Sequence, residues 1–178
     1  MSGPLPLITL PDFETLVIDR LYACCSEINE LTSAKMSVFK MSPSFALNPS
    51  QFPACFSFVG AMTTPTPIEQ IGSGVNTRVR DYVIRILGDP YGSTIDNNAT
   101  EGAQGPINLL PYFNAMYSYF LGHPSLQTTA LDSLRYIAEQ ILMSDSGFVI
   151  RPAPGGADHF AIDFTLTITM RAQISTLA

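Results

Sequence analysis

Apolar side chains recur every three or four positions between residues 12 and 34, and this spacing predicts an amphipathic helix that lies on a sheet. At 1.5 Å per residue, such a helix spans roughly 34 Å. Pro11 and Asp12 are typical of a helix start, Asp12 either as the capping residue or as an acid near the positive end of the helix dipole. The apolar face consists of Phe13, Leu16, Val17, Leu21, Cys24, Ile28 and Leu31.

Alternation with a period of two predicts two long strands. Residues 77–87 read TRVRDYVIRIL and are largely apolar on both faces, which favours a central strand or one covered from two sides. Residues 160–171 alternate strictly between large apolar side chains and smaller or polar ones. They predict an antiparallel strand with one buried and one polar face. Shorter strands are expected at Ser37–Met41 and Cys55–Val59, with a proline-rich loop at 43–53 between them.

The remaining segments are less regular. Residues 88–105 are rich in glycine, asparagine and acids and predict a long loop. A second helix is expected to begin with Pro106 in its first turn and to stop at residues 122–124. Residues 129–143 fit helical spacing, whereas Asp145-Ser146-Gly147 looks like a hairpin turn before the strand at 148–150. For residues 129–143 we expect a helical or irregular stretch that runs into a strand.

Together these elements predict an α+β fold, a mostly antiparallel sheet flanked by the N-terminal amphipathic helix and the second helix. At 178 residues the chain fits one domain, 1–178, with an N-terminal arm at 1–11 and the long loop at 88–105.

The amino-acid composition excludes several classes of protein. The chain is 46% apolar and 13% charged, with a formal charge of -6, so it is not a disordered chain. Affinity for duplex DNA depends on clustered Lys and Arg, and this chain has only Lys35 and Lys40 as lysines. The N-terminus lacks the basic and apolar regions of a secretory signal, and no apolar run approaches the length of a membrane helix, so we expect an intracellular protein. Cys24, Cys25 and Cys55 are interpreted as small hydrophobes rather than a redox or metal set.

No residue pattern assembles a nucleophile, a base and an orienting group, so the chain is predicted not to be an enzyme and to hold no catalytic, cofactor or metal site. His123 is expected at a helix end, and His159 at the solvent-facing start of the last strand. The acids Asp89, Asp96 and Glu101 lack the residue order of a calcium loop, and a solvated loop is the simpler interpretation.

Arg78, Arg80 and Arg85 share one predicted strand. Two interpretations stay open for them: inter-subunit salt bridges, or a solvated margin of the sheet.

Several features follow one another in a characteristic order: the helix at 12–34, Phe52-Pro53-Ala54-Cys55, the strand Arg80–Ile86 before a long loop, Phe120–Leu126, Gly147, and the terminal strand Phe160–Arg171. In this order the chain resembles the tail-terminator, or tail-completion, proteins of long-tailed bacteriophages. The similarity spans about residues 12–174.

The resemblance implies an α+β subunit of a homo-oligomeric ring, with a hexamer expected, that caps the tail tube in the virion and joins it to the head and neck. It implies no activity and no cofactor, assembly in the host cytoplasm, and as partners the tail tube protein and a neck or head completion protein, with no membrane. DNA would pass through the lumen without specific binding, and we place Asp89, Asp96 and Glu101 there as an acidic lining or interface loop. A neck (head–tail joining) subunit and a non-viral binding module stay open as alternatives.

Overall fold

The centre of the fold is the pairing of its two longest strands, β4 (Val75–Leu87) and β6 (Asp158–Ile174). They run antiparallel from Val75 opposite Gln173 to Leu87 opposite Ala161. The computed structural model describes residues 7–8, 10–31, 36–60, 75–88, 109–124, 126, 140–152 and 158–174. Within these residues six strands form one mixed sheet that is mostly antiparallel.

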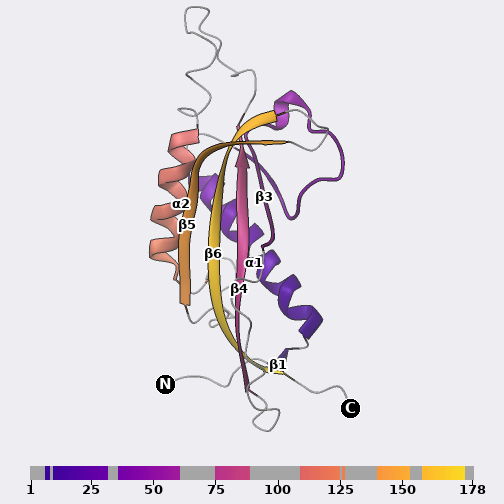
Figure 1. Ribbon diagram of the computed structural model, residues 1–178, viewed down its shortest axis with the longest axis vertical. Coiled ribbons are helices and arrows are strands. Elements are labelled where there is room, and N and C mark those ends of the chain that lie inside the picture. Colours follow the sequence, from indigo (N-terminus) through magenta and orange to yellow (C-terminus); the bar gives the residue numbers. More distant parts are fainter. Residues whose placement is uncertain are drawn as a thin grey trace, which may run out of the picture.

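The other strands extend this pair on both sides. β3 (Ala54–Val59) lies antiparallel beside β4, and β2 (Ser37–Phe39) lies parallel beside β3. β5 (Gln140–Pro152) runs antiparallel along the other edge of β6, where the two-residue β1 (Leu7–Ile8) continues in line with it at Gln173. The outer strands are therefore β2 on one side and β5, with β1, on the other (Figure 1).

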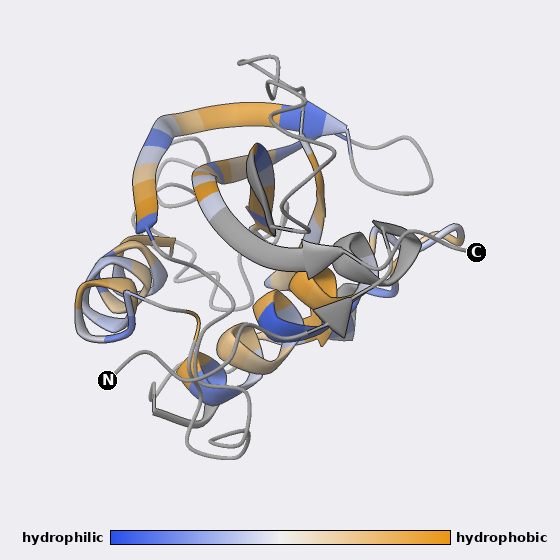
Figure 2. Ribbon diagram, turned by 90° about the horizontal axis from the view of Figure 1, so that it is seen from below, coloured by the Kyte–Doolittle hydropathy of each residue, from blue (hydrophilic) through white to orange (hydrophobic). Residues whose placement is uncertain are grey.

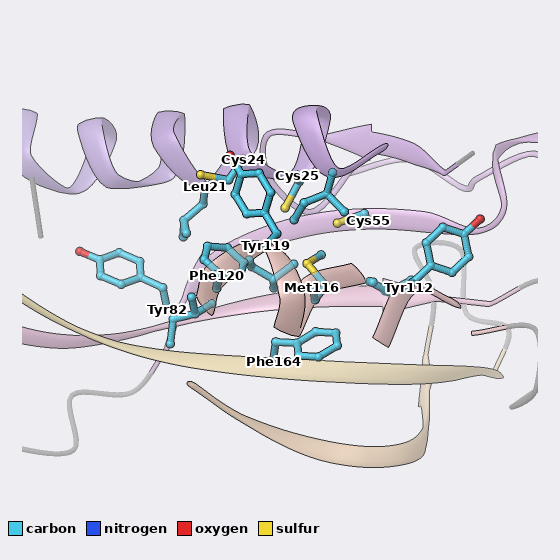
Figure 3. Close-up of a cluster of buried hydrophobic side chains, with 14 of the residues drawn as sticks. Leu21, Cys24, Cys25, Cys55, Tyr82, Tyr112, Met116, Tyr119, Phe120 and Phe164 are labelled. Carbon is cyan, nitrogen blue, oxygen red and sulfur yellow. The ribbon is translucent and has the colours of Figure 1, made fainter. Parts of the chain in front are cut away.

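Both helices cover the same face of the sheet. α1 (Leu10–Leu31) and α2 (Leu110–Gly122) share one buried cluster with the inward residues of β3, β4 and β6 (Figure 3). The apolar spacing of α1 places Val17, Leu21 and Ile28 in this cluster at 0–1% exposure. α2 brings a heavy aromatic and sulfur-containing face, and Met116 and Tyr119 lie between α1 and the sheet (Figure 3).

The opposite face of the sheet carries a smaller core at one end. Ala54, Phe56, Leu87 and Ala161 are buried there, beneath residues of the 40–53 connection that includes the short 3-10 helix η1 (Pro49–Gln51). Figure 1 shows β5 and β6 bending together at this end, toward η1. The bend covers part of the second face of the sheet.

Much of the predicted architecture is confirmed. The α+β class, the two helices, and the strands at 37–39, 54–59, 75–87 and 158–174 are present. β4 is flanked by β3 and β6, and its two faces contribute to two different clusters, as the apolar pattern on both faces predicted. α1 (Leu10–Leu31) begins at Leu10 rather than at residue 12, so Pro11 and Asp12 lie inside its first turn, while the predicted end at 32–34 lies outside the described residues. Within the predicted arm at 1–11, Leu7–Ile8 form β1, and residues 1–6 and 9 lie outside the described residues.

Three expectations about local structure are wrong. Residues 140–143 already belong to a strand and not to the expected helical or irregular stretch, because they pair with β6. Asp145-Ser146-Gly147 is a β-bulge inside the continuous strand β5 and not a hairpin turn. α2 begins at Leu110, so the proline in its first turn is Pro111 and not Pro106. Residues 106, 129–139 and 89–105 lie outside the described residues.

The expected polar face of the last strand is also wrong in part. Ala161 is fully buried and Asp163 is only 8% exposed. The bend of β5 and β6 explains this difference, because it packs the second face of their ends against the 40–53 connection. A single strand's alternation indicates which residues share a face, but not whether that face is covered elsewhere in the fold.

Candidate interaction surface

The outer strand β5 exposes large apolar side chains. Leu142, Phe148 and Ile150 are 58%, 44% and 60% exposed. In the described part of the chain β5 pairs with β6 along one edge, and no strand lies along its other edge. Figure 2 shows β5 as a curved outer arc with a long hydrophobic stretch beyond the bend. Exposed apolar groups along a strand edge are typical of a surface that meets another chain.

A second group of exposed apolar side chains lies beside β2, at the opposite edge of the sheet. Met41 and Phe45 are 58% and 55% exposed. The Phe45 ring meets the Phe39 ring of β2 edge-on, with the centroids 6.5 Å apart. Lys40, at the end of β2, forms a surface ion pair with Asp19 of α1 in which both side chains remain about half exposed. The margin of the sheet at β2 therefore exposes apolar side chains, Met41 and Phe45, next to the charged Lys40.

The β5 bulge is held by side chains rather than by the strand ladder. The backbone N–H of Asp163 donates to Ser146 Oγ at 3.0 Å, in place of a ladder partner. The N–H of Gly147 donates to Asp145 Oδ1 at 2.7 Å, and the Tyr117 hydroxyl of α2 donates to Asp145 Oδ2 at 2.6 Å. This hydrogen bond to the Asp145 carboxylate raises the pKa of Tyr117. Asp145 therefore joins the bulge to α2.

Gly147 supplies the backbone conformation of the bulge. Its φ is +64°, in the left-handed region where glycine is favoured over residues with a Cβ. Bulges at a sheet edge increase the local twist and redirect the strand. The bend of β5 beyond this point therefore has a specific local cause.

A buried ion cluster lies on the second face of the sheet, next to the bulge. Arg85 of β4 binds Asp163 through two hydrogen bonds, Nε to Oδ1 at 2.6 Å and Nη2 to Oδ2 at 2.8 Å. Arg151 of β5 donates from Nε to the same Oδ2 at 3.0 Å, and the Arg85 guanidinium carbon lies 5.1 Å from the Phe58 ring centroid. Burial alone would raise the pKa of Asp163, but the hydrogen bonds and charges of the two arginines outweigh it and lower that pKa.

The three arginines named from the sequence do not share one environment. Arg85 is bound within its own chain by Asp163. Arg80 stands opposite Ile168 and so points to the helix-covered side, whereas Arg85 points to the other side. Arg80 is half-buried, and the Arg78 side chain lies outside the described residues. An inter-subunit role for these residues stays a prediction.

The acids expected at a lumen or interface, Asp89, Asp96 and Glu101, lie outside the described residues. The described chain reaches Gly88, whose N–H donates to the Phe160 carbonyl oxygen at 2.7 Å. Gly88, the last described residue before these acids, therefore lies beside Phe160 at the bent end of β6.

The two histidines have structural partners. His123 caps the C-terminal end of α2, as expected, with Nδ1 2.9 Å from the Tyr119 carbonyl oxygen and its ring stacked on Tyr119 at 4.1 Å. His159 was expected to face solvent, and that expectation is wrong. The residue is 4% exposed, its Nδ1 lies 2.9 Å from the Gly88 carbonyl oxygen, and its ring stacks on the Phe52 ring with the centroids 4.4 Å apart.

The three cysteines lie in the core where α1 meets β3, which confirms their interpretation as small buried hydrophobes. Figure 3 shows the sulfur atoms of Cys25 and Cys55 pointing toward one another. A hydrogen bond with Cys55, together with burial, raises the pKa of Cys25. Desolvation raises the pKa of Cys24 to about 12. Thiols with raised pKa values are poor nucleophiles at neutral pH.

Among the described residues, no group of three or more His, Cys, Asp or Glu side chains is arranged to hold a metal ion. No helix in that part of the chain has both the length and the apolar character needed to cross a membrane. A scan against protein-family models and a search of curated protein sequences find no match to this chain. The candidate surface therefore rests on the exposed margins of the sheet.

Several residues of this surface were missed by the sequence analysis. Asp145 and Phe148 were noted only as members of a turn and a strand, and Lys40 only as one of the two lysines and within the strand expected at 37–41. The apolar run at 148–150 is the one signal that could have pointed to the β5 edge, since it directly follows the polar residues 144–146. Its exposure depends on the bulge and the bend, which no local pattern specifies.

Proposed function

We propose that this protein is a structural virion subunit, a tail terminator that forms a homo-oligomeric ring, caps the tail tube of a long-tailed phage and joins it to the head and neck. In this role the chain performs no catalysis and needs no cofactor. Its task is to present surfaces to its own copies and to adjoining virion parts.

The observation that best supports the proposal is that apolar side chains are exposed at both margins of one sheet. Met41 and Phe45 lie beside β2, and Leu142, Phe148 and Ile150 lie on β5. Burying such groups against another chain is favourable by roughly 25 cal/mol per Å² of apolar surface. Two different patches on one subunit suit a head-to-tail contact, which closes into a ring when the rotation between copies permits it.

The acidic balance of the chain suits a ring through which DNA moves. Fifteen acidic side chains against nine basic ones leave a formal charge of -6. An acidic lumen repels the phosphate backbone and so prevents DNA from adhering during passage. We assign this lining to the segment that carries Asp89, Asp96 and Glu101.

The proposal is tested by the mass and shape of the purified protein. Light scattering during size-exclusion chromatography should give a multiple of 19.3 kDa, and negative-stain images should show closed rings. The rings should bind one end of tubes assembled from tail tube protein. Rings that bind only a head completion protein would favour the neck position instead. A monomer at every concentration tested would refute both assignments.

The lumen assignment has its own test. The triple substitution Asp89→Asn, Asp96→Asn and Glu101→Gln removes three negative charges from the proposed lining. Rings should still assemble, while DNA packaging or DNA passage during infection should change. Loss of assembly would instead show that this segment belongs to a subunit contact.

A further inference from the structure

We propose that β5 of one copy pairs with β2 of the next copy, so that a continuous sheet joins neighbouring subunits. This inference rests on the proposed ring function and names the contact that would build the ring. The occupant of the β5 edge is thus a second copy of this chain, presented through its β2 edge and the residues that follow it.

Strand directions within one sheet support this pairing. β2 is parallel to β3, and each later step, from β3 to β4, from β4 to β6 and from β6 to β5, is antiparallel. β2 and β5 therefore run in opposite directions at the two margins. A second copy placed in the same orientation beside β5 presents its β2 antiparallel to it. Antiparallel pairing is the more stable arrangement per residue.

The register places opposite charges at the same level. Asp145 stands opposite Phe164, which stands opposite Ile84, which stands opposite Ser57. On the far side, the Ser57 hydroxyl donates to the Lys40 carbonyl oxygen at 3.1 Å, one residue beyond the last β2–β3 pair. Residues directly opposite one another in a sheet point to the same face. These paired residues form one row of side chains across the sheet, with Lys40 at one end of the row and Asp145 at the other.

A head-to-tail contact in this register brings Lys40 of one copy beside Asp145 of its neighbour. Asp145 is exposed, and the Lys40 side chain is 50% exposed. The Lys40 ammonium group has three N–H donors, and its ion pair with Asp19 leaves donors for a second acceptor. The charges are therefore complementary across the proposed contact, and both lie on the helix-covered side of the joined sheet.

The same register also matches apolar groups. Val38 lies two residues before Lys40 on β2, and Phe148 lies at the same level on β5. The pairings that connect them across the sheet run through Cys55, Ile86 and Ile162. Phe148 is 44% exposed on the isolated chain and would contact Val38 of the next copy. The next apolar residue on that side, Ile150, is 60% exposed and would be covered by the same neighbour.

A two-fold contact between two β5 strands lacks this complementarity. Arg151 is turned to the other face of the sheet by Asp163, while Asp145 is held on the helix side by Tyr117. Neither side chain can meet the opposite charge of a second β5, because the two point to opposite faces. Asp145 is the only charged residue that β5 presents on the helix-covered side, so a symmetric pairing centred near it would bring two like carboxylates together, and like charges at close range oppose association.

The contact can be tested by oxidative cross-linking between two cysteine variants. Met41→Cys and Ser144→Cys both change exposed residues, and Ser144 stands in the row of Thr165, Val83 and Phe58, which is the row next to that of Lys40. Disulfides form only where the two Cα atoms come within about 7 Å. The native cysteines give no background, since all three are buried. Ser118→Cys, on the exposed side of α2, is the matched control for Ser144→Cys.

Mixed Met41→Cys and Ser144→Cys chains, carrying different mass tags, should give at least roughly tenfold more covalent dimer than Met41→Cys mixed with Ser118→Cys. Neither variant alone should cross-link. A chain carrying both substitutions should form a ladder that ends at the number of subunits in the ring, since its own two cysteines lie about 19 Å apart across four strand spacings.

Other results overturn the inference in distinguishable ways. Cross-linking of Ser144→Cys with itself would show a two-fold β5 contact. Rings that form normally but never cross-link in the mixture would leave the ring function standing and refute this contact. Samples in which every variant and the unmodified chain stay monomeric would refute the ring function and the contact together.

Discussion

Removing Asp163 should destabilise this protein more than any single change at its surface. The carboxylate is 11% exposed and receives two hydrogen bonds from Arg85 and one from Arg151. Arg85 is itself only 19% exposed. Asp163→Ala therefore leaves a largely buried guanidinium without its counterion and removes the acceptor that links Arg151 of β5 to Arg85 of β4.

The size of the effect follows from how buried each partner is. Removing one member of a buried ion pair costs about 3–5 kcal/mol, because the remaining charge stays desolvated. Arg151 is 39% exposed, and the loss of a pair that solvent can screen costs about 0–1 kcal/mol. Arg151→Ala is therefore the matched control, since it removes one arginine from the cluster and leaves the Arg85 pair in place.

Urea unfolding at one fixed protein concentration measures both changes by linear extrapolation. Asp163→Ala should lower the free energy of unfolding several times more than Arg151→Ala does. Equal losses, or a loss below about 1 kcal/mol for Asp163→Ala, would show that the cluster is solvated rather than buried and would refute the reasoning.

Three further predictions follow from other features. Because the folded-state pKa of Asp163 is lowered, its contribution to stability is complete above an unfolded-state pKa of about 3.9 and is lost as the pH falls through the lowered value. Asp163→Asn should therefore flatten the urea midpoint against pH below about pH 4, and parallel curves would contradict this. Gly147→Ala should cost about 1–2 kcal/mol in urea unfolding because the φ of +64° strains a Cβ, whereas Gly122→Ala, in open space at a helix end, should be neutral or stabilising. A maleimide reagent at pH 7 should label no cysteine in the folded chain and all three in urea, since Cys24 is buried with a pKa of about 12; rapid labelling of the folded chain would mean that the α1–β3 contact opens.

The regular elements could be predicted because their signals are local and repeated. The apolar spacing of residues 13–31 matches the helix period over several turns, and α1 forms along it. The alternation from Phe160 to Arg171 matches the strand period, and β6 forms there. Such patterns predict the fold because the face of a helix or strand that is buried carries the same positions at which the apolar residues recur.

The bulge could not be predicted, because its local signature is ambiguous. Asp145-Ser146-Gly147 is typical of a turn, and nothing within it specifies whether the chain reverses or continues. The outcome depends on two donors from outside the segment: the Tyr117 hydroxyl donates to Asp145 Oδ2, and the N–H of Asp163 donates to Ser146 Oγ. Contacts between residues far apart in sequence decide this segment, so single-segment analysis gave the wrong structure for residues 140–147.

The candidate surface was hidden from the sequence for a related reason. Lys40 and Asp145 are 105 positions apart, and only the chain of pairings through β3, β4 and β6 places them in one row. The bulge at Ser146 and Gly147 contributes directly, because it sets which residues of β5 lie level with β2. A one-residue change of register would turn Asp145 and Phe148 to the opposite face. The hydrogen bonds that hold the bulge therefore also fix the pattern of charge and apolar groups offered to a second copy, so a substitution at Gly147 should weaken assembly as well as folding.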